Sequence, residues 1–165
     1  MKRYVGLSCV LVLSLAFGLA LVASGGEEKT KAMAGPGKYM ADYATSKDFF
    51  TLMSGMKMGK SPHGSVQIYY STNIKDMIGM DSFMVPVGTV SIKPFDNDGT
   101  PGVDGIAVMI KKEAGYDPAN NDWYYEMRDA KGNLKDMPAP GKTKMCIDCH
   151  AVYPSKDYLG GTQIR

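Results

Sequence analysis

Apolar and polar residues alternate over several short segments of the chain, and a period of two predicts β-strands. The alternation is clearest at 65–71, where Val66, Ile68 and Tyr70 would share one face. Further segments with this pattern lie at 88–93, 106–110 and 123–128. Because turn-forming residues such as Asp-Asn-Asp-Gly at 96–99 separate the segments, we expect consecutive strands to pair in an antiparallel sheet.

Two other segments have patterns that favour helices. Over 38–58 the apolar residues recur at mixed spacings, which indicates one or two short amphipathic helices broken near Thr45 and Ser46. A shorter helix is expected over 73–80, whereas 133–144 loses periodicity and gains Pro and Gly, as in a loop. The expected fold class is therefore α+β, a mainly antiparallel β-sheet with flanking helices.

The first residues have the pattern of a targeting segment. A basic Lys-Arg pair at 2–3 precedes an almost wholly apolar run over 5–22, and small residues then lead into an acidic stretch. This order is typical of a signal peptide, predicted here over 1–24. We expect a flexible lead-in over 25–37, one domain over 38–165, and a periplasmic or extracellular location. The length of the apolar run leaves open an uncleaved helix that anchors the protein in a membrane.

The charge balance bears on the class of partner. The 165-residue chain has 19 basic and 17 acidic side chains. Loss of the basic pair with the signal peptide would leave 17 of each, so the mature chain would be formally neutral. No segment concentrates Lys and Arg, and we therefore expect no nucleic-acid partner.

The cysteines carry the clearest chemical signal. Cys9 lies in the predicted signal peptide, so Cys146 and Cys149 would be the only two cysteines of the exported domain. With His150 they form Cys-X-X-Cys-His, in which two thiols on one helical turn can bond the same edge of a haem. The imidazole that follows is then placed to bind the iron as its proximal ligand. We expect one covalently bound haem c.

Three other roles for the cysteine pair stay open. A thioredoxin-like redox pair normally belongs to a fold of alternating strands and helices, which this pattern does not predict. A zinc site needs a second pair of ligands, and beyond His150 the chain offers only His63 and carboxylates. An inert structural disulfide is the third alternative. Haem attachment explains the adjacent histidine as well as both thiols.

The opposite face of the iron is harder to predict. No Met or His follows His150, so upstream residues must form this face. A Met ligand, or His63 as the only other histidine, would make a six-coordinate electron carrier. An apolar wall, for which Phe49, Phe50 and Phe83 are candidates, would instead leave the iron open to a small ligand such as nitric oxide.

Several short motifs besides the haem motif resemble the cytochrome P-460 and cytochrome c′-beta family. They are Pro62-His63-Gly64 with the strand after it, the strand over 87–93, Trp123-Tyr124-Tyr125 leading into Asp129-Ala130-Lys131-Gly132, and Asp157-Tyr158. The resemblance covers roughly residues 38–160. It implies a mainly antiparallel β domain with flanking helices, a haem with His150 as proximal ligand, and usually no protein ligand on the distal side.

The resemblance also identifies a candidate residue for enzymatic activity. The hydroxylamine-oxidising members carry a lysine bonded covalently to the porphyrin, and Lys93 is the best-placed candidate because it ends a strand on the face opposite Val90 and Ile92. A solvated strand residue is the alternative for Lys93. Those enzymes also use a distal carboxylate, for which neither Glu113 nor Glu126 is a convincing match.

Three functions therefore stay open, each for an exported protein and each dependent on the haem. The first is a redox module that binds a small diatomic or nitrogen-oxide ligand, the second an enzyme that oxidises hydroxylamine, and the third a plain electron carrier. We expect a periplasmic redox partner, and a homodimer stays open. The alternative fold is the all-α four-helix bundle of cytochromes c′, which also have Cys-X-X-Cys-His near the C-terminus.

Overall fold

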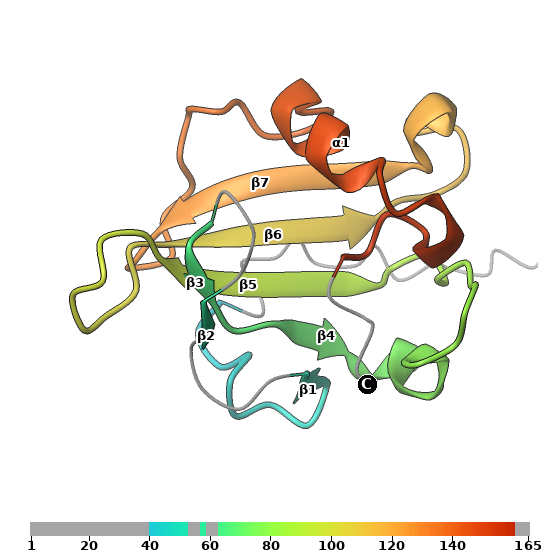
Figure 1. The fold of residues 1–165 in the computed structure, drawn as a ribbon. Helices are drawn as coiled ribbons and strands as arrows, with labels where there is room; N and C mark the ends of the chain where they lie inside the picture. Colours follow the sequence, from blue (N-terminus) through green and yellow to red (C-terminus); the bar gives the residue numbers. More distant parts are fainter. Residues whose placement is uncertain (1–39, 53–56, 59–62, 161–165) are drawn as a thin grey trace, which may run out of the picture. The chain divides into compact units, whose positions relative to one another are not determined.

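Seven strands form one antiparallel sheet in the computed structural model, which describes residues 40–52, 57–58 and 63–160 (Figure 1). The strands are β1 (Phe49–Thr51), β2 (Lys57–Met58), β3 (Ser65–Val66), β4 (Tyr69–Ser71), β5 (Val90–Asp96), β6 (Gly105–Lys111) and β7 (Trp123–Asp129). The helices are the α-helix α1 (Lys144–His150) and the short 3₁₀ helices η2 (Thr72–Met77), η3 (Pro118–Asn120) and η4 (Pro154–Lys156). Sheet is thus the main regular structure of the described residues.

The described residues belong to one compact unit, Met33–Arg165. The predicted signal peptide over 1–24 and the lead-in over 25–37 lie outside the described residues, as do the first two residues of the predicted domain. In the part of the chain that the structure describes, none of the helices has the length and apolarity that crossing a membrane requires.

The long strands β5, β6 and β7 form the centre of the sheet. Each pairs with the next in an antiparallel register that runs through Ile92 opposite Val108 and Met109 opposite Tyr125. The other edge of β5 is shared by β4 and β3, which pair in turn with β1 and β2. The predictions of strands over 88–93, 106–110 and 123–128 and of their antiparallel pairing are confirmed.

The strand predicted over 65–71 is interrupted. β3 ends at Val66 and β4 begins at Tyr69, and the gap lies opposite Pro94 of β5. Proline has no N–H to donate, so a regular ladder of hydrogen bonds cannot continue past it. The Gln67 amide still donates across the gap, to the Pro94 carbonyl at 3.2 Å.

The helices predicted over 38–58 are wrong in the part that is described. Residues 40–45 form turns, and Phe49 to Thr51 form β1, which pairs with β4. The mixed spacing of the apolar residues does not fit a helical period, while Phe and Thr suit a strand whose partner is already in place. The helix predicted over 73–80 is present as η2, which is shorter and of the 3₁₀ type.

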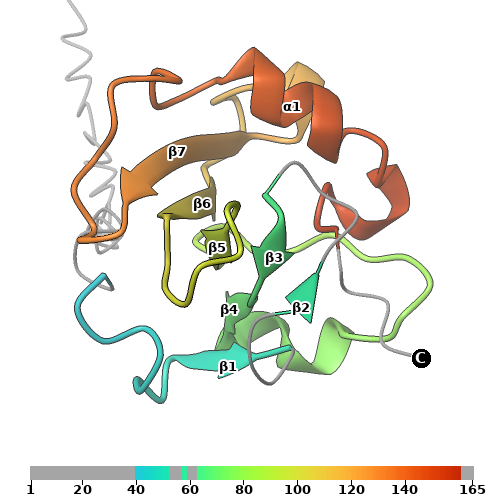
Figure 2. The ribbon, with the colours of Figure 1, turned by 60° about the vertical axis from the view of Figure 1, so that its left-hand side comes forward.

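The two faces of the sheet carry different side chains. One face holds a cluster of buried residues that includes Phe95, Met109, Trp123 and Tyr125, and Cys146, Ile147 and Ala151 of the α1 segment pack against it. The other face holds a second cluster, formed by Phe49, Tyr69, Val90, Ile92, Ile106, Val108 and Ile110. Figures 1 and 2 both place α1 next to β7.

The all-α four-helix bundle, the alternative to the β fold, is wrong. The described residues contain a single α-helix of seven residues, α1. The period-two segments cannot form helices with one apolar stripe, because alternate residues of a helix point in different directions. The fold is mainly antiparallel sheet with few helices.

Candidate functional site

The helix α1 presents the Cys-X-X-Cys-His residues on one side. Residues three and four apart share a face of a helix, so Cys146, Cys149 and His150 form a stripe. The helix begins after Thr143, beyond the Pro-rich and Gly-rich loop, and an exposed Lys144–Asp148 pair at 2.7 Å spans its first turn. Such an exposed pair contributes little stability, so the packing of α1 on the sheet is the stronger constraint on its position.

A pocket lies between this stripe and the sheet. It has a cavity volume of about 80 Å³. Its lining on α1 comprises Met145, Cys146, Cys149 and His150, and its lining on the sheet side comprises His63, Ser91, Lys93, Ala107, Val108, Met109, Tyr125, Glu126 and Met127. Met145 and Cys149 are exposed, so this side of the pocket reaches solvent.

The structure thus brings together the Cys-X-X-Cys-His residues and the candidate crosslinking lysine. Cys146, Cys149, His150 and Lys93 line one pocket, although Lys93 lies more than fifty positions before the cysteines. His63 lines it as well. The three candidates for an apolar wall do not: Phe50 and Phe83 belong to the core of the same sheet face, and Phe49 to the opposite face.

His150 is held in one orientation. Its Nδ1 lies 2.8 Å from the carbonyl oxygen of Tyr158, and its ring lies 5.7 Å from that of Tyr125. A carbonyl can only accept, so Nδ1 carries the hydrogen and Nε2 carries the lone pair. Burial lowers the pKa of His150, which favours the neutral imidazole. A neutral imidazole with its lone pair on Nε2 is the form that binds a metal.

The two thiols are free, and they differ in exposure. Cys146 is half-buried and Cys149 is exposed. Burial, followed by the nearby Cys149, raises the pKa of Cys146 to about 11. A redox-active pair needs a thiolate, which a lowered pKa provides. The environment of Cys146 therefore does not favour the thioredoxin-like alternative.

Lys93 lies in the middle of β5, not at the end of a strand as predicted. Alternation places it on the face opposite Val90 and Ile92, which belong to the second core cluster. Burial lowers the pKa of Lys93. Its side chain is therefore partly removed from water, which does not fit the alternative of a solvated strand residue.

His63 precedes β3 and lies close to the other basic side chains of the pocket. Its pKa is lowered to about 4, first by burial and then by the charges of Lys93 and His150. The ring of His63 lies 5.3 Å from that of Phe95. At neutral pH His63 is therefore a neutral imidazole, with the chemistry of a ligand or a hydrogen-bonding group.

Tyr125 contributes a polar atom that the described residues leave unsatisfied. Its side chain is 1% exposed, and its hydroxyl has no hydrogen-bond partner among the described residues. Burial raises the pKa of Tyr125, so the hydroxyl keeps its proton. A buried hydroxyl without a partner costs free energy, and one that lines a pocket is expected to bond to whatever occupies it.

Of the two carboxylates considered for the distal side, Glu126 borders the pocket but its carboxylate is bonded on the other face of β7, and Glu113 lies outside the pocket. The carboxylate of Glu126 accepts from Arg128 Nε at 2.5 Å and from Tyr124 Oη at 3.0 Å. Arg128 and Tyr124 occupy alternate positions of β7, on the face opposite Tyr125. Glu113 is exposed and does not line the pocket. Neither carboxylate is directed at the centre of the site.

Sequence reasoning missed the floor of the pocket. Met109, Tyr125 and Met127 form it together with Ala107, which pairs with Lys93. The sequence shows that these residues occupy alternate positions along β6 and β7. A period of two does not tell, however, which face of a strand covers the core and which meets α1. The register between the strands supplied that information.

Comparison of the chain with known proteins gave no match to a family model, to a curated protein or to a solved structure.

Proposed function

We propose that this chain is an exported monohaem c-type cytochrome of the cytochrome P-460 and cytochrome c′-beta type, whose haem iron is redox-active and binds a small ligand. One observation carries the proposal: Cys146, Cys149 and His150 line the same pocket, and His150 directs Nδ1 at a carbonyl. Two thiols and a neutral imidazole on one helical turn are the groups that hold haem c.

Each of these residues has a defined task. The thiols of Cys146 and Cys149 would form thioether bonds to one edge of the haem, and Nε2 of His150 would bind the iron. The Tyr158 carbonyl would keep the imidazole in the tautomer that ligation requires. When bound, the haem supplies an iron that changes between ferric and ferrous states and can accept a diatomic or nitrogen-oxide ligand.

The remaining lining fits an aromatic macrocycle. Ala107, Met109 and Met127 offer an apolar surface on the sheet, and the thioether of methionine makes favourable contacts with aromatic rings. Tyr125 supplies a buried hydroxyl that the described residues do not satisfy. An apolar floor with a buried hydroxyl that has no partner among the described residues suits a mainly apolar group better than it suits zinc.

The electron-carrier alternative depends on His63 and two methionines. His63, Met109 and Met127 line the same pocket as His150, so each is a candidate for a second axial ligand. The lowered pKa of His63, about 4, favours the neutral ring that ligation needs. A ligand from this group would close the iron to diatomic molecules.

Ferric and ferrous spectra with and without carbon monoxide separate these two functions. The protein is produced in a host that matures c-type haem, and we expect the ferrous spectrum to change when carbon monoxide is added. A low-spin spectrum that ignores carbon monoxide would exclude the open iron. His63→Phe, Met109→Leu and Met127→Leu would then distinguish these candidates, because only loss of the true ligand opens the iron.

Covalent attachment is tested by mass after denaturation. The wild type should retain the mass of one haem, Cys146→Ser/Cys149→Ser should lose it, and Met145→Leu on the same helix should keep it. A haem that stays attached to the double variant would contradict the thioether assignment, unless Lys93 alone holds it.

The enzymatic alternative depends on Lys93. Its place in the pocket and its lowered pKa favour a reactive amine, as a lysine crosslink to the porphyrin would require. Digestion of the haem protein followed by mass spectrometry tests it: a crosslink joins the Lys93 peptide to the haem peptide. Lys93→Arg should abolish that species and Lys112→Arg should not. Recovery of an unmodified Lys93 peptide in full yield would exclude this enzyme.

A further inference from the structure

A buried ion pair lies beside the pocket but does not line it. Lys111 of β6 and Asp157, which follows η4, have side chains that are 9% and 0% exposed. Lys111 Nζ donates to both carboxylate oxygens of Asp157, at 2.8 and 2.7 Å. Removing two charges from water costs free energy that their attraction does not always return, so a pair of this kind often has a role other than stability.

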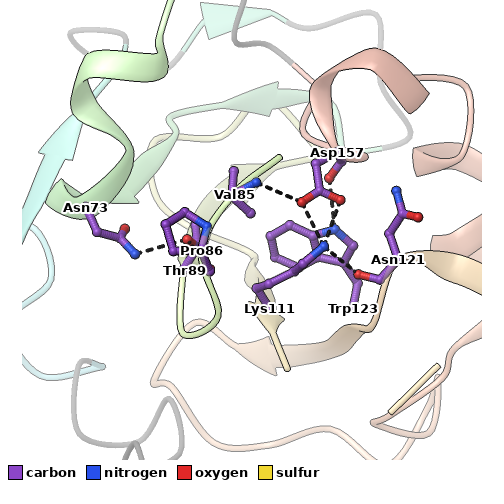
Figure 3. Close-up of polar contacts among 8 residues, drawn as sticks. All are labelled: Asn73, Val85, Pro86, Thr89, Lys111, Asn121, Trp123 and Asp157. Atoms are coloured by element: carbon purple, nitrogen blue, oxygen red, sulfur yellow. Dashed lines mark hydrogen bonds and ion pairs between the residues drawn. The ribbon is translucent and has the colours of Figure 1, made fainter. Parts of the chain in front are cut away.

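Asp157 is held from several directions (Figure 3). Its Oδ2 also accepts from the Val85 amide at 3.0 Å, and its main-chain carbonyl accepts from Trp123 Nε1 at 2.8 Å. Lys111 Nζ is itself tied to the Asn121 carbonyl at 2.7 Å. The segment after α1 is therefore fastened to both β6 and β7 through one residue.

The backbone at this point is strained. Asp157 and Tyr158 have φ angles of 48° and 66°, so two successive residues with side chains occupy the left-handed region. Such a conformation persists only where the surroundings enforce it, and it is concentrated at functional sites. This conformation of the backbone brings the carbonyl oxygen of Tyr158 to 2.8 Å from Nδ1 of His150.

We infer that the Lys111–Asp157 pair positions the imidazole of His150 for iron coordination, by fixing the turn that presents the Tyr158 carbonyl. Lys111 and Asp157 are positioning residues, because they act on His150 through the main chain and do not touch it. The inference rests on the proposed haem ligation and adds to it the residues that set the strength of the proximal bond.

The direction of the effect follows from the hydrogen bond. Donation from Nδ1 to a carbonyl makes Nε2 a stronger electron donor to the iron and stabilises the ferric state. If the turn relaxes, the hydrogen bond between His150 Nδ1 and the Tyr158 carbonyl lengthens. The iron–histidine bond then weakens, and the reduction potential of the haem rises. A purely structural role would lower the stability of the protein without this signature.

The test uses Lys111→Met and Asp157→Asn in the full haem-loaded protein. We expect the ferrous iron–histidine stretching band to move to lower frequency and the reduction potential to move upward in both. Asn tolerates the left-handed backbone, so Asp157→Asn removes the charge without changing the turn preference. Lys111→Gln, which removes the charge and carries a polar group on a side chain one bond shorter, replaces Lys111→Met if that variant does not fold, and the same shifts are expected.

Two controls separate positioning from stability. Ile92→Ala opens a cavity on the opposite face of the sheet and should lower the melting temperature while leaving band and potential unchanged. The double variant Lys111→Met/Asp157→Asn has no unpaired buried charge and should regain melting temperature, yet keep the shifted band and potential. Unchanged band and potential in the folded single variants would overturn the inference.

Failure of the haem assignment is distinguishable from failure of this inference. If the wild type carries no haem, nitrogen NMR of His150 in the same full chain replaces the iron readouts. We then expect hydrogen on Nδ1 in the wild type and a mixture of tautomers in Lys111→Met and Asp157→Asn. Hydrogen on Nδ1 in all three proteins would overturn the positioning role.

Discussion

At the scale of single residues, the polar side chains of the pocket differ in whether they have a hydrogen-bond partner. His150 Nδ1 has a carbonyl partner, whereas the more deeply buried hydroxyl of Tyr125 has none among the described residues. Tyr70 provides a comparison, because it is also 1% exposed but donates to the Gly160 carbonyl at 2.9 Å. The Tyr70 hydroxyl therefore stabilises the fold, whereas the Tyr125 hydroxyl is available to a group in the pocket.

Removing each hydroxyl should affect the free energy of unfolding differently when the protein is produced without the proposed haem. Tyr125→Phe deletes an unsatisfied group and should raise the free energy of unfolding by about 1 kcal/mol or leave it unchanged. Tyr70→Phe leaves the Gly160 carbonyl without its donor and should lower it by about 1–2 kcal/mol. Urea unfolding measures both. A loss in Tyr125→Phe as large as that in Tyr70→Phe would mean that the Tyr125 hydroxyl has a partner.

At the scale of elements, the three long strands fix the distance between the sheet and α1. Gly105 at the start of β6 shows how close the packing is, because an added Cβ would lie 2.6 Å from Phe95 Cζ and 3.0 Å from the Arg128 carbonyl. Phe95 belongs to the same core cluster as Tyr125. The first residue of β6 therefore couples the pairing of the strands to the wall of the pocket.

Gly105→Ala should destabilise the protein by about 1–3 kcal/mol, since the Arg128 carbonyl is main chain and cannot move aside without disturbing β7. The displaced Phe95 ring also contacts His63, at a ring separation of 5.3 Å, so the absorption spectrum of the proposed haem should change together with the stability. Thermal unfolding and the absorption spectrum measure the two effects. A variant with wild-type stability would contradict the close approach of β5, β6 and β7.

The strands and helices also show which elements can be predicted from the local pattern of apolar and polar residues. Strands with a clear period of two were predicted with their pairing, because alternate residues of a strand point to opposite faces of a sheet and the turns between the strands are local. The segment 38–58 was predicted as helix and pairs in part as strand, because its irregular spacing left the outcome to β4, a partner twenty residues away. Pro94 interrupted another predicted strand from across the sheet.

At the scale of the whole molecule, the proposal includes export, which depends on residues outside the described ranges. Cells that export and mature the protein should yield a soluble chain that lacks about the first 24 residues, because the pattern over 1–24 is that of a signal peptide. The intact mass of the purified protein measures this. Recovery of the full chain from Met1 in the membrane fraction would support the uncleaved anchor instead.

The sequence by itself determined the candidate haem-attachment residues, because Cys146, Cys149 and His150 lie within five positions of one another and their chemistry can be recognised without a fold. It also determined the main strands and their turns, whose periodicity is local. Only the tertiary structure decided which residues surround Cys146, Cys149 and His150. Tyr125 and Lys93 reach the pocket through strand register, and Lys111 meets Asp157 across 46 positions of the chain. Such contacts depend on how distant segments pack, which no local pattern of residues encodes.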